Sequence, residues 1–122
     1  LANYGEYSGN PNQEETYLYT QAVLNLLLRS QAKKKVLIVG GGVANFTDIR
    51  ATFKGVIRAL AEKKQELRNQ EVKVFVRRGG PNQKEGLAIM QTFLTEEDLL
   101  GRVVGPDVLL TDIIHDAIQT IQ

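Results

Sequence analysis

The chain has 122 residues, of which 43% are hydrophobic and 24% are charged, and its fifteen Lys and Arg residues nearly balance its fourteen Asp and Glu residues. This balance argues against a nucleic-acid or membrane partner, and the lack of cysteine excludes disulfides, thiolate metal sites and a Cys nucleophile. No apolar run approaches the roughly 20 residues of a membrane span. We therefore expect one cytoplasmic domain over 1–122, and the start at Leu1 suggests a fragment of a longer chain.

The first third of the chain predicts a strand, a helix and a second strand. Residues 1–9 are rich in β-forming residues and end at a glycine. A helix then extends to about Ser30, with Asn10 as its cap and Pro11 in its first turn. The continuous apolar run at 34–41 is typical of a parallel strand that is buried on both faces.

The remaining two thirds continue the alternation of helices and strands. Apolar residues at helical or strand spacing predict, in chain order, a helix at 46–66, a strand at 71–80, a helix at 81–94, a short strand at 101–106 and a closing helix at 107–121. The order βαβαβαβα predicts an α/β fold, in which a parallel sheet carries helices on both faces, because parallel strands are joined by helical crossovers.

In open α/β sheets a ligand binds at the carboxyl ends of the strands. Here those ends are rich in glycine, Asn, Thr and Arg, at 8–11, 40–48, 77–82 and 105–107. Glycines expose backbone N–H groups, helix N-termini add positive potential, and arginine offers a two-pronged donor for carboxylate or phosphate. The sequence therefore predicts a site for a ligand with several negative charges.

A dinucleotide site fits these residues poorly. The Gly-x-Gly pattern of Gly40 and Gly42 is followed by Asn45 where a small residue is needed. The next strand ends in Arg77 and Arg78, where an acidic residue would bind a ribose. Arginine there suits a 2′-phosphate, so NADP stays open as an alternative, whereas a P-loop is excluded because no Gly-Lys-Ser/Thr follows the glycines.

Three further features do not identify a site by themselves. Arg77 and Arg78 must point to opposite faces of their strand, and the residues alone do not decide which faces the ligand. His115, the only histidine, is expected to be a solvated residue beside the closing helix's apolar stripe, which comprises Leu110, Ile114, Ala117, Ile118 and Ile121. Thr95 followed by three acidic residues is interpreted as a capped first turn and not as a metal site.

Four motifs occur in order along the chain: "LANYGEYSG", "GGGVANFTD", "ATFKG" and "VFVRRGGPN". Together they resemble the citrate-binding domain of ATP-citrate lyase, a relative of the ATP-grasp subunit of succinyl-CoA synthetase, over essentially the whole chain. The resemblance implies a flavodoxin-like fold of the succinyl-CoA synthetase type.

The resemblance also assigns the ligand and its residues. It implies citrate as the bound partner, with contacts from Gly9, Gly42, Asn45, Thr47 and Arg78. An arginine, an amide, a hydroxyl and backbone N–H groups suit the carboxylates and hydroxyl of citrate.

The resemblance further implies that the helix at 46–66 is the family's power helix, whose N-terminus helps to stabilise a phosphohistidine. Two positions depart from the pattern. Gly42 stands where animal members have Ser, so a hydroxyl contact is lost, and Arg50 stands where animal and plant members have a small residue.

The full enzyme of this family makes acetyl-CoA and oxaloacetate from citrate, CoA and ATP through citryl-phosphate and citryl-CoA. The resemblance implies that ATP, Mg and CoA bind to other domains, and that this chain carries no catalytic residue, metal site or cofactor of its own. We expect it to bind citrate without turnover and to join other domains or subunits in a homo- or hetero-oligomer. The alternatives are the equivalent domain of citryl-CoA synthetase, an NADP-binding domain and a subunit-docking module.

Overall fold

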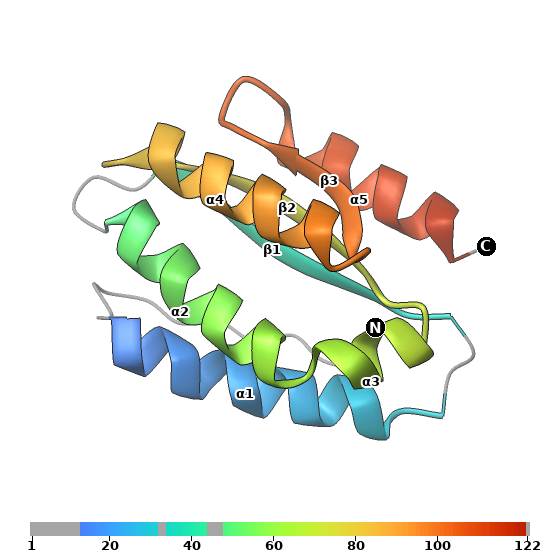
Figure 1. Ribbon diagram of the computed structural model, residues 1–122. Coiled ribbons are helices and arrows are strands. Elements are labelled where there is room, and N and C mark those ends of the chain that lie inside the picture. The colour runs from blue at the N-terminus through green and yellow to red at the C-terminus, as the bar shows by residue number, and fades with distance from the viewer. Residues whose placement is uncertain (1–12, 32–33, 44–47, 122) are drawn as a thin grey trace.

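The computed structural model describes residues 13–31, 34–43 and 48–121 (Figure 1). Helices and strands alternate along this part of the chain as predicted, except that two helices follow β1. The elements are α1 (Gln13–Arg29), β1 (Val36–Val43), α2 (Ile49–Glu62), α3 (Lys64–Asn69), β2 (Lys73–Gly79), α4 (Gln83–Glu96), β3 (Leu100–Val104) and α5 (Leu110–Thr120).

The described strands form a parallel sheet in the order β1-β2-β3. Val36 of β1 pairs with Lys73 of β2, and Val76 of β2 pairs with Val103 of β3. The α/β fold with a parallel sheet is therefore confirmed. The strand predicted at 1–9 lies outside the described residues.

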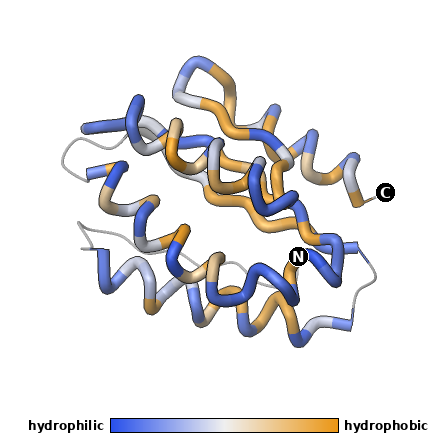
Figure 2. Tube along the Cα trace, in the orientation of Figure 1, coloured by the Kyte–Doolittle hydropathy of each residue, from blue (hydrophilic) through white to orange (hydrophobic). Residues whose placement is uncertain are grey.

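Helices cover both faces of the sheet, also as predicted. On one face α2 and α4 pack together, and α1 lies along α2; α5 packs on the opposite face against β1 and β2 (Figure 1). The strands form the most continuous hydrophobic stretches, whereas the helices alternate between hydrophobic and hydrophilic residues (Figure 2). The central strand β2 is the most buried, with Val74, Phe75 and Val76 covered by helices on both faces of the sheet.

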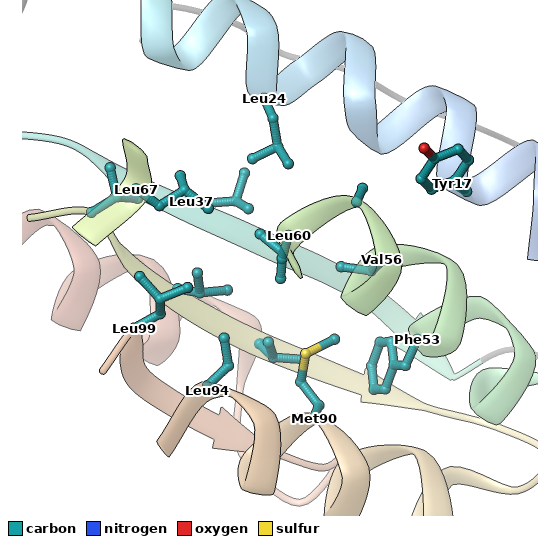
Figure 3. Close-up of a cluster of buried hydrophobic side chains, with 14 of the residues drawn as sticks. Tyr17, Leu24, Leu37, Phe53, Val56, Leu60, Leu67, Met90, Leu94 and Leu99 are labelled. Carbon is teal, nitrogen blue, oxygen red and sulfur yellow. The ribbon is translucent and has the colours of Figure 1, made fainter. Parts of the chain in front are cut away.

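The larger core lies between α1, α2, α4 and the sheet (Figure 3). Phe53 and Leu60 of α2 and Met90 and Leu94 of α4 are fully buried in it. The smaller core joins Phe75 of β2 to α5. The apolar residues at helical spacing that predict the helix at 46–66 thus form the face that α2 buries, and Arg50, Lys54, Arg58 and Glu62 are exposed.

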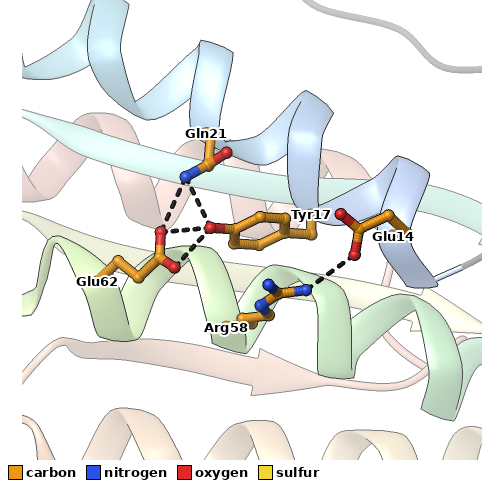
Figure 4. Close-up of polar contacts among 5 residues, drawn as sticks. All are labelled: Glu14, Tyr17, Gln21, Arg58 and Glu62. Atoms are coloured by element: carbon orange, nitrogen blue, oxygen red, sulfur yellow. Dashed lines mark hydrogen bonds and ion pairs between the residues drawn. The ribbon is translucent and has the colours of Figure 1, made fainter.

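A polar network fixes α1 to α2 (Figure 4). The Tyr17 hydroxyl donates to the Glu62 carboxylate at 2.5 and 2.6 Å, and the Gln21 amide donates to the same carboxylate at 2.8 Å. Arg58 lies over the Tyr17 ring, 3.9 Å from its centre, and pairs with Glu14 at 2.8 Å. Three side chains of α1 therefore contact two of α2.

The single helix predicted at 46–66 is divided into α2 and α3 at Lys63. The Lys63 N–H bonds the Leu60 carbonyl at 3.1 Å, a three-residue spacing that tightens the chain at the end of α2. The short α3 then places Leu67 in the core with no exposed surface.

The prediction of a capped first turn at Thr95 is wrong. Helix α4 continues through Thr95 to Glu96, and the Thr95 hydroxyl donates to the Gln91 carbonyl at 2.7 Å, one turn back in the same helix. The chain leaves the helix at Asp98, which has a left-handed backbone with φ 57°.

The stripe predicted on α5 is also partly wrong. Ile113 and Ala117 form the buried face, whereas Ile114, Ile118 and Ile121 are exposed. His115 is exposed and lies 3.1 Å from the Gln119 amide, so its interpretation as a solvated helix residue is confirmed.

Candidate functional site

The carboxyl edge of the sheet brings the ends of β1 and β2 together. Gly40 pairs with Arg77, but the next pair along the strands is Val43 with Gly79. β1 therefore contains one more residue than β2 over this stretch, which is a β-bulge. Arg78 lies opposite the bulge, so its backbone is next to that of Gly42 on the neighbouring strand.

Strand alternation places the Arg78 side chain on the face covered by α2 and α4. Val76 and Val74, two and four residues before Arg78, are buried in the core under these helices, whereas Phe75 belongs to the core under α5. Arg78 is half-buried, and this burial lowers the pKa of its guanidinium from the ordinary value. An arginine still carries its full positive charge under these conditions.

Arg77 points to the opposite face and has a different role. Its Nε donates to the Val108 carbonyl at 2.8 Å, and its Nη2 donates to the Pro106 carbonyl at 3.0 Å. Both carbonyls lie in the loop between β3 and α5. Arg77 therefore fixes this loop to the end of β2, and Arg78 is the member of the pair on the α2 and α4 side.

Helices α2 and α4 both begin at this edge, and their first residues are bonded to each other. The Ile49 N–H donates to the Pro81 carbonyl at 2.9 Å, and the Asn82 amide donates to Asp48 Oδ1 at 3.2 Å. Asp48 is the N-cap of α2, because its Oδ1 also accepts from the Ala51 N–H at 3.2 Å. The hydrogen bond from Asn82, followed by that from Ala51, lowers the pKa of the Asp48 carboxyl.

The turn between Arg78 and α4 has an unusual backbone. Gly80 has φ 141° and Asn82 has φ 61°, both in regions that favour glycine or asparagine. A side chain at Gly86, one turn into α4, would lie 3.1 Å from Ile49 Cγ2 and 3.2 Å from the Arg50 nitrogen. Gly86 thus lets the start of α4 approach the backbone of α2.

The structure describes two of the five predicted citrate residues. Gly42 and Arg78 lie at the same edge, on neighbouring strands. Gly9, Asn45 and Thr47 lie outside the described residues, although position 47 directly precedes the cap residue Asp48. Sequence reasoning missed the bond between Asp48 and Asn82; the only signal was that both residues occupy helix-start positions.

A metal-binding group is not found among the described residues, and one cleft lies away from this edge. Within residues 13–31, 34–43 and 48–121, no group of three or more His, Cys, Asp or Glu side chains is placed to hold a metal ion. A shallow cleft of about 430 Å³, lined in part by Lys73 and Arg102, lies at the opposite edge, where β2 and β3 begin. Both cations are paired there, with Asp98 and Asp116. No described helix has the length and apolar character needed to cross a membrane.

The chain is thus an α/β domain. At the carboxyl edge of its sheet, the half-buried Arg78 lies beside a glycine bulge and the start of two helices. The family model for "ATP citrate lyase citrate-binding" matches residues 1–120, and the chain belongs to this family. The chain is 44% identical over 122 residues to ATP-citrate synthase alpha chain protein 2 of Arabidopsis thaliana, and 44% identical over 119 residues to ATP-citrate synthase of Mus musculus.

Solved structures agree with this assignment. ATP citrate lyase from Methanothrix soehngenii, solved with citrate and coenzyme A, is 46% identical and superposes with a TM-score of 0.90 over 95% of the chain. The Methanosaeta concilii enzyme with (3S)-citryl-CoA gives the same values. The chain spans 31% and 29% of those proteins, 29% of the Arabidopsis relative and 11% of the mouse relative. The predicted family is confirmed.

Proposed function

We propose that this chain binds citrate at the carboxyl edge of its sheet, with Arg78 as the main charged contact. The observation that carries the proposal is the position of Arg78: half-buried, opposite the Gly41–Gly42 bulge, and on the face where α2 and α4 begin. A guanidinium in that position pairs with a carboxylate through two parallel charge-assisted hydrogen bonds. Partial burial strengthens this attraction relative to a fully exposed ion pair.

The remaining contacts follow from the family. The backbone of Gly9 and Gly42, the Asn45 amide and the Thr47 hydroxyl complete a set of donors that suits the other carboxylates and the hydroxyl of citrate. With Gly at position 42, only the backbone N–H is offered there. Arg50 pairs with Glu85 at 3.3 Å, with both side chains largely exposed, and we assign it no direct citrate contact.

We further propose that the chain is the citrate-binding part of an ATP-citrate lyase. The full enzyme would make acetyl-CoA and oxaloacetate from citrate, CoA and ATP, with ATP, Mg and CoA bound by other domains, in a cytoplasmic homo- or hetero-oligomer. The citrate-bound Methanothrix relative at 46% identity supports this proposal. A citryl-CoA synthetase would use the same domain and differ elsewhere in the chain.

Ligand selectivity tests the proposal. Citrate should raise the melting temperature of the chain more than succinate, ATP or NADP does at equal ionic strength, because a ligand that binds only the folded state stabilises it by RT ln(1 + [L]/Kd). At about 100 times Kd this amounts to roughly 2.7 kcal/mol. A larger shift with NADP than with citrate would favour the dinucleotide alternative and contradict the proposal.

A further inference from the structure

The start of α2 is bonded to the turn that follows Arg78 through two separate contacts. One is between backbones, from the Ile49 N–H to the Pro81 carbonyl at 2.9 Å. The other is between side chains, from the Asn82 amide to Asp48 Oδ1 at 3.2 Å. The two contacts join residues more than thirty positions apart in the sequence, at the edge where the proposed citrate site lies.

Two backbone donors at the start of α2 are already used by the protein. The first N–H groups of a helix have no partner within the helix and are often free to bind an anion. Here the Ile49 N–H donates to the Pro81 carbonyl, and the Ala51 N–H donates to Asp48 Oδ1. These two donors therefore hold the start of the helix in place.

Asn82 is held in the geometry that this contact needs. It has a left-handed backbone with φ 61°, and it occupies the N-cap position of α4 without capping that helix through its side chain. Its amide bonds Asp48 instead. The hydrogen bond from Asn82 is also the largest cause of the lowered pKa of the Asp48 carboxyl. A donor lowers the pKa in this way because it stabilises the charged carboxylate.

We propose that Asp48 and Asn82 form a positioning pair that fixes the start of α2 against the turn after Arg78 and so aligns two parts of the proposed citrate site. The proposal rests on the proposed citrate function. Neither residue needs to contact citrate. The pair acts through geometry, because a shift of either segment would change the distance between Arg78 and the start of α2.

The negative charge of Asp48 can be removed without removing the hydrogen bonds that its side chain accepts. The side-chain oxygen of asparagine can accept the same bonds from Ala51 and Asn82, whereas alanine accepts neither. A carboxylate near a citrate site also repels the ligand. Asp48→Asn should therefore keep the alignment and bind citrate as well as the original chain or more tightly, while Asp48→Ala should bind it less tightly.

A double-mutant cycle with citrate titration tests the pair. Asp48→Ala and Asn82→Ala should each weaken citrate binding by about three- to tenfold, and the double variant should be no worse than the worse single variant, because coupled residues are not additive. Tyr17→Phe is the matched control: it removes a hydrogen bond between α1 and α2 and should leave the citrate Kd unchanged.

Asp48→Asn supplies the readout that a general loss of stability would not give. If it binds citrate as weakly as Asp48→Ala, or if the losses of the two alanine variants multiply in the double variant, the positioning pair is overturned. Hydrogen exchange of the Ile49 amide gives an independent test without citrate, and we expect faster exchange in both alanine variants. Unchanged Ile49 protection in both would overturn the pair, whereas a wild-type chain that binds no citrate would overturn the proposed function.

Discussion

Arg77 and Val108 are joined across the carboxyl edge of the sheet by a hydrogen bond of 2.8 Å from the guanidinium Nε to the Val108 carbonyl. A second bond from Nη2 reaches the Pro106 carbonyl at 3.0 Å. One side chain of β2 thereby fixes the loop that leads into α5. The neighbouring Arg78 points to the other face, so of two adjacent arginines only Arg78 lies on the side of the proposed citrate site.

Replacing Arg77 with alanine is expected to reduce the free energy of unfolding by about 1–3 kcal/mol, because a charged donor to two loop carbonyls is lost. Urea denaturation measures the change. Arg102→Ala is the control, since Arg102 makes an exposed ion pair with Asp116 that is worth at most about 1 kcal/mol. Equal losses in the two variants would contradict the structural role of Arg77.

Tyr17→Phe should destabilise the chain by about 0.5–1.5 kcal/mol through loss of the hydroxyl that donates to Glu62. The hydrogen bond to Glu62, followed by burial and the Glu62 charge, raises the pKa of Tyr17, so the hydroxyl stays protonated at neutral pH. Thermal unfolding at neutral pH measures the effect. A Phe variant as stable as the original chain would show that the network in Figure 4 contributes little.

Gly86→Ala should destabilise the chain even though alanine favours helices. The new methyl group would lie 3.1 Å from Ile49 Cγ2 and 3.2 Å from the Arg50 nitrogen, and the backbone of α2 cannot easily move away. Overpacking of this kind costs about 1–3 kcal/mol, more than the roughly 1 kcal/mol that alanine gains over glycine in a helix. Calorimetric unfolding decides the sign. A stabilised variant would mean that α2 and α4 adjust their contact freely.

The lowered pKa of Asp48 predicts a contribution to stability that depends on pH. Because the carboxylate is favoured in the folded state, its contribution is fully present above the unfolded value of 3.8 and is lost as the pH falls through the lower folded value. Asp48→Asn cannot titrate, so its stability should fall less steeply than that of the original chain at acid pH. Parallel acid-unfolding curves would contradict this prediction.

Much of the fold could be predicted because apolar spacing dominates the buried elements. The run at 34–41 forms most of β1, and Ile49, Phe53 and Leu60 form the buried side of α2. Element ends were less predictable. Thr95 followed by Glu suits both the start and the end of a helix, and only the tertiary position of Leu94 and Leu99 in the core decides between them.

The candidate site could be predicted only in part. Strand alternation showed that Arg77 and Arg78 differ, but the choice between them needed either the family resemblance or the positions of α2 and α5. The contact between Asp48 and Asn82 depends on how two helices meet, thirty-four residues apart in the chain, and no local pattern encodes it.

Calorimetric titration of citrate into the chain and its Arg78 variants tests the central claim most directly. Arg78→Ala should weaken citrate binding by about 2–4 kcal/mol, as expected when one partner of a partly buried charged pair is removed. Arg78→Lys should recover only part of this, because lysine cannot make the paired bonds, and Arg77→Ala should weaken binding much less. A loss at Arg77 equal to or larger than that at Arg78, or citrate binding unaffected by Arg78→Ala, would contradict the account.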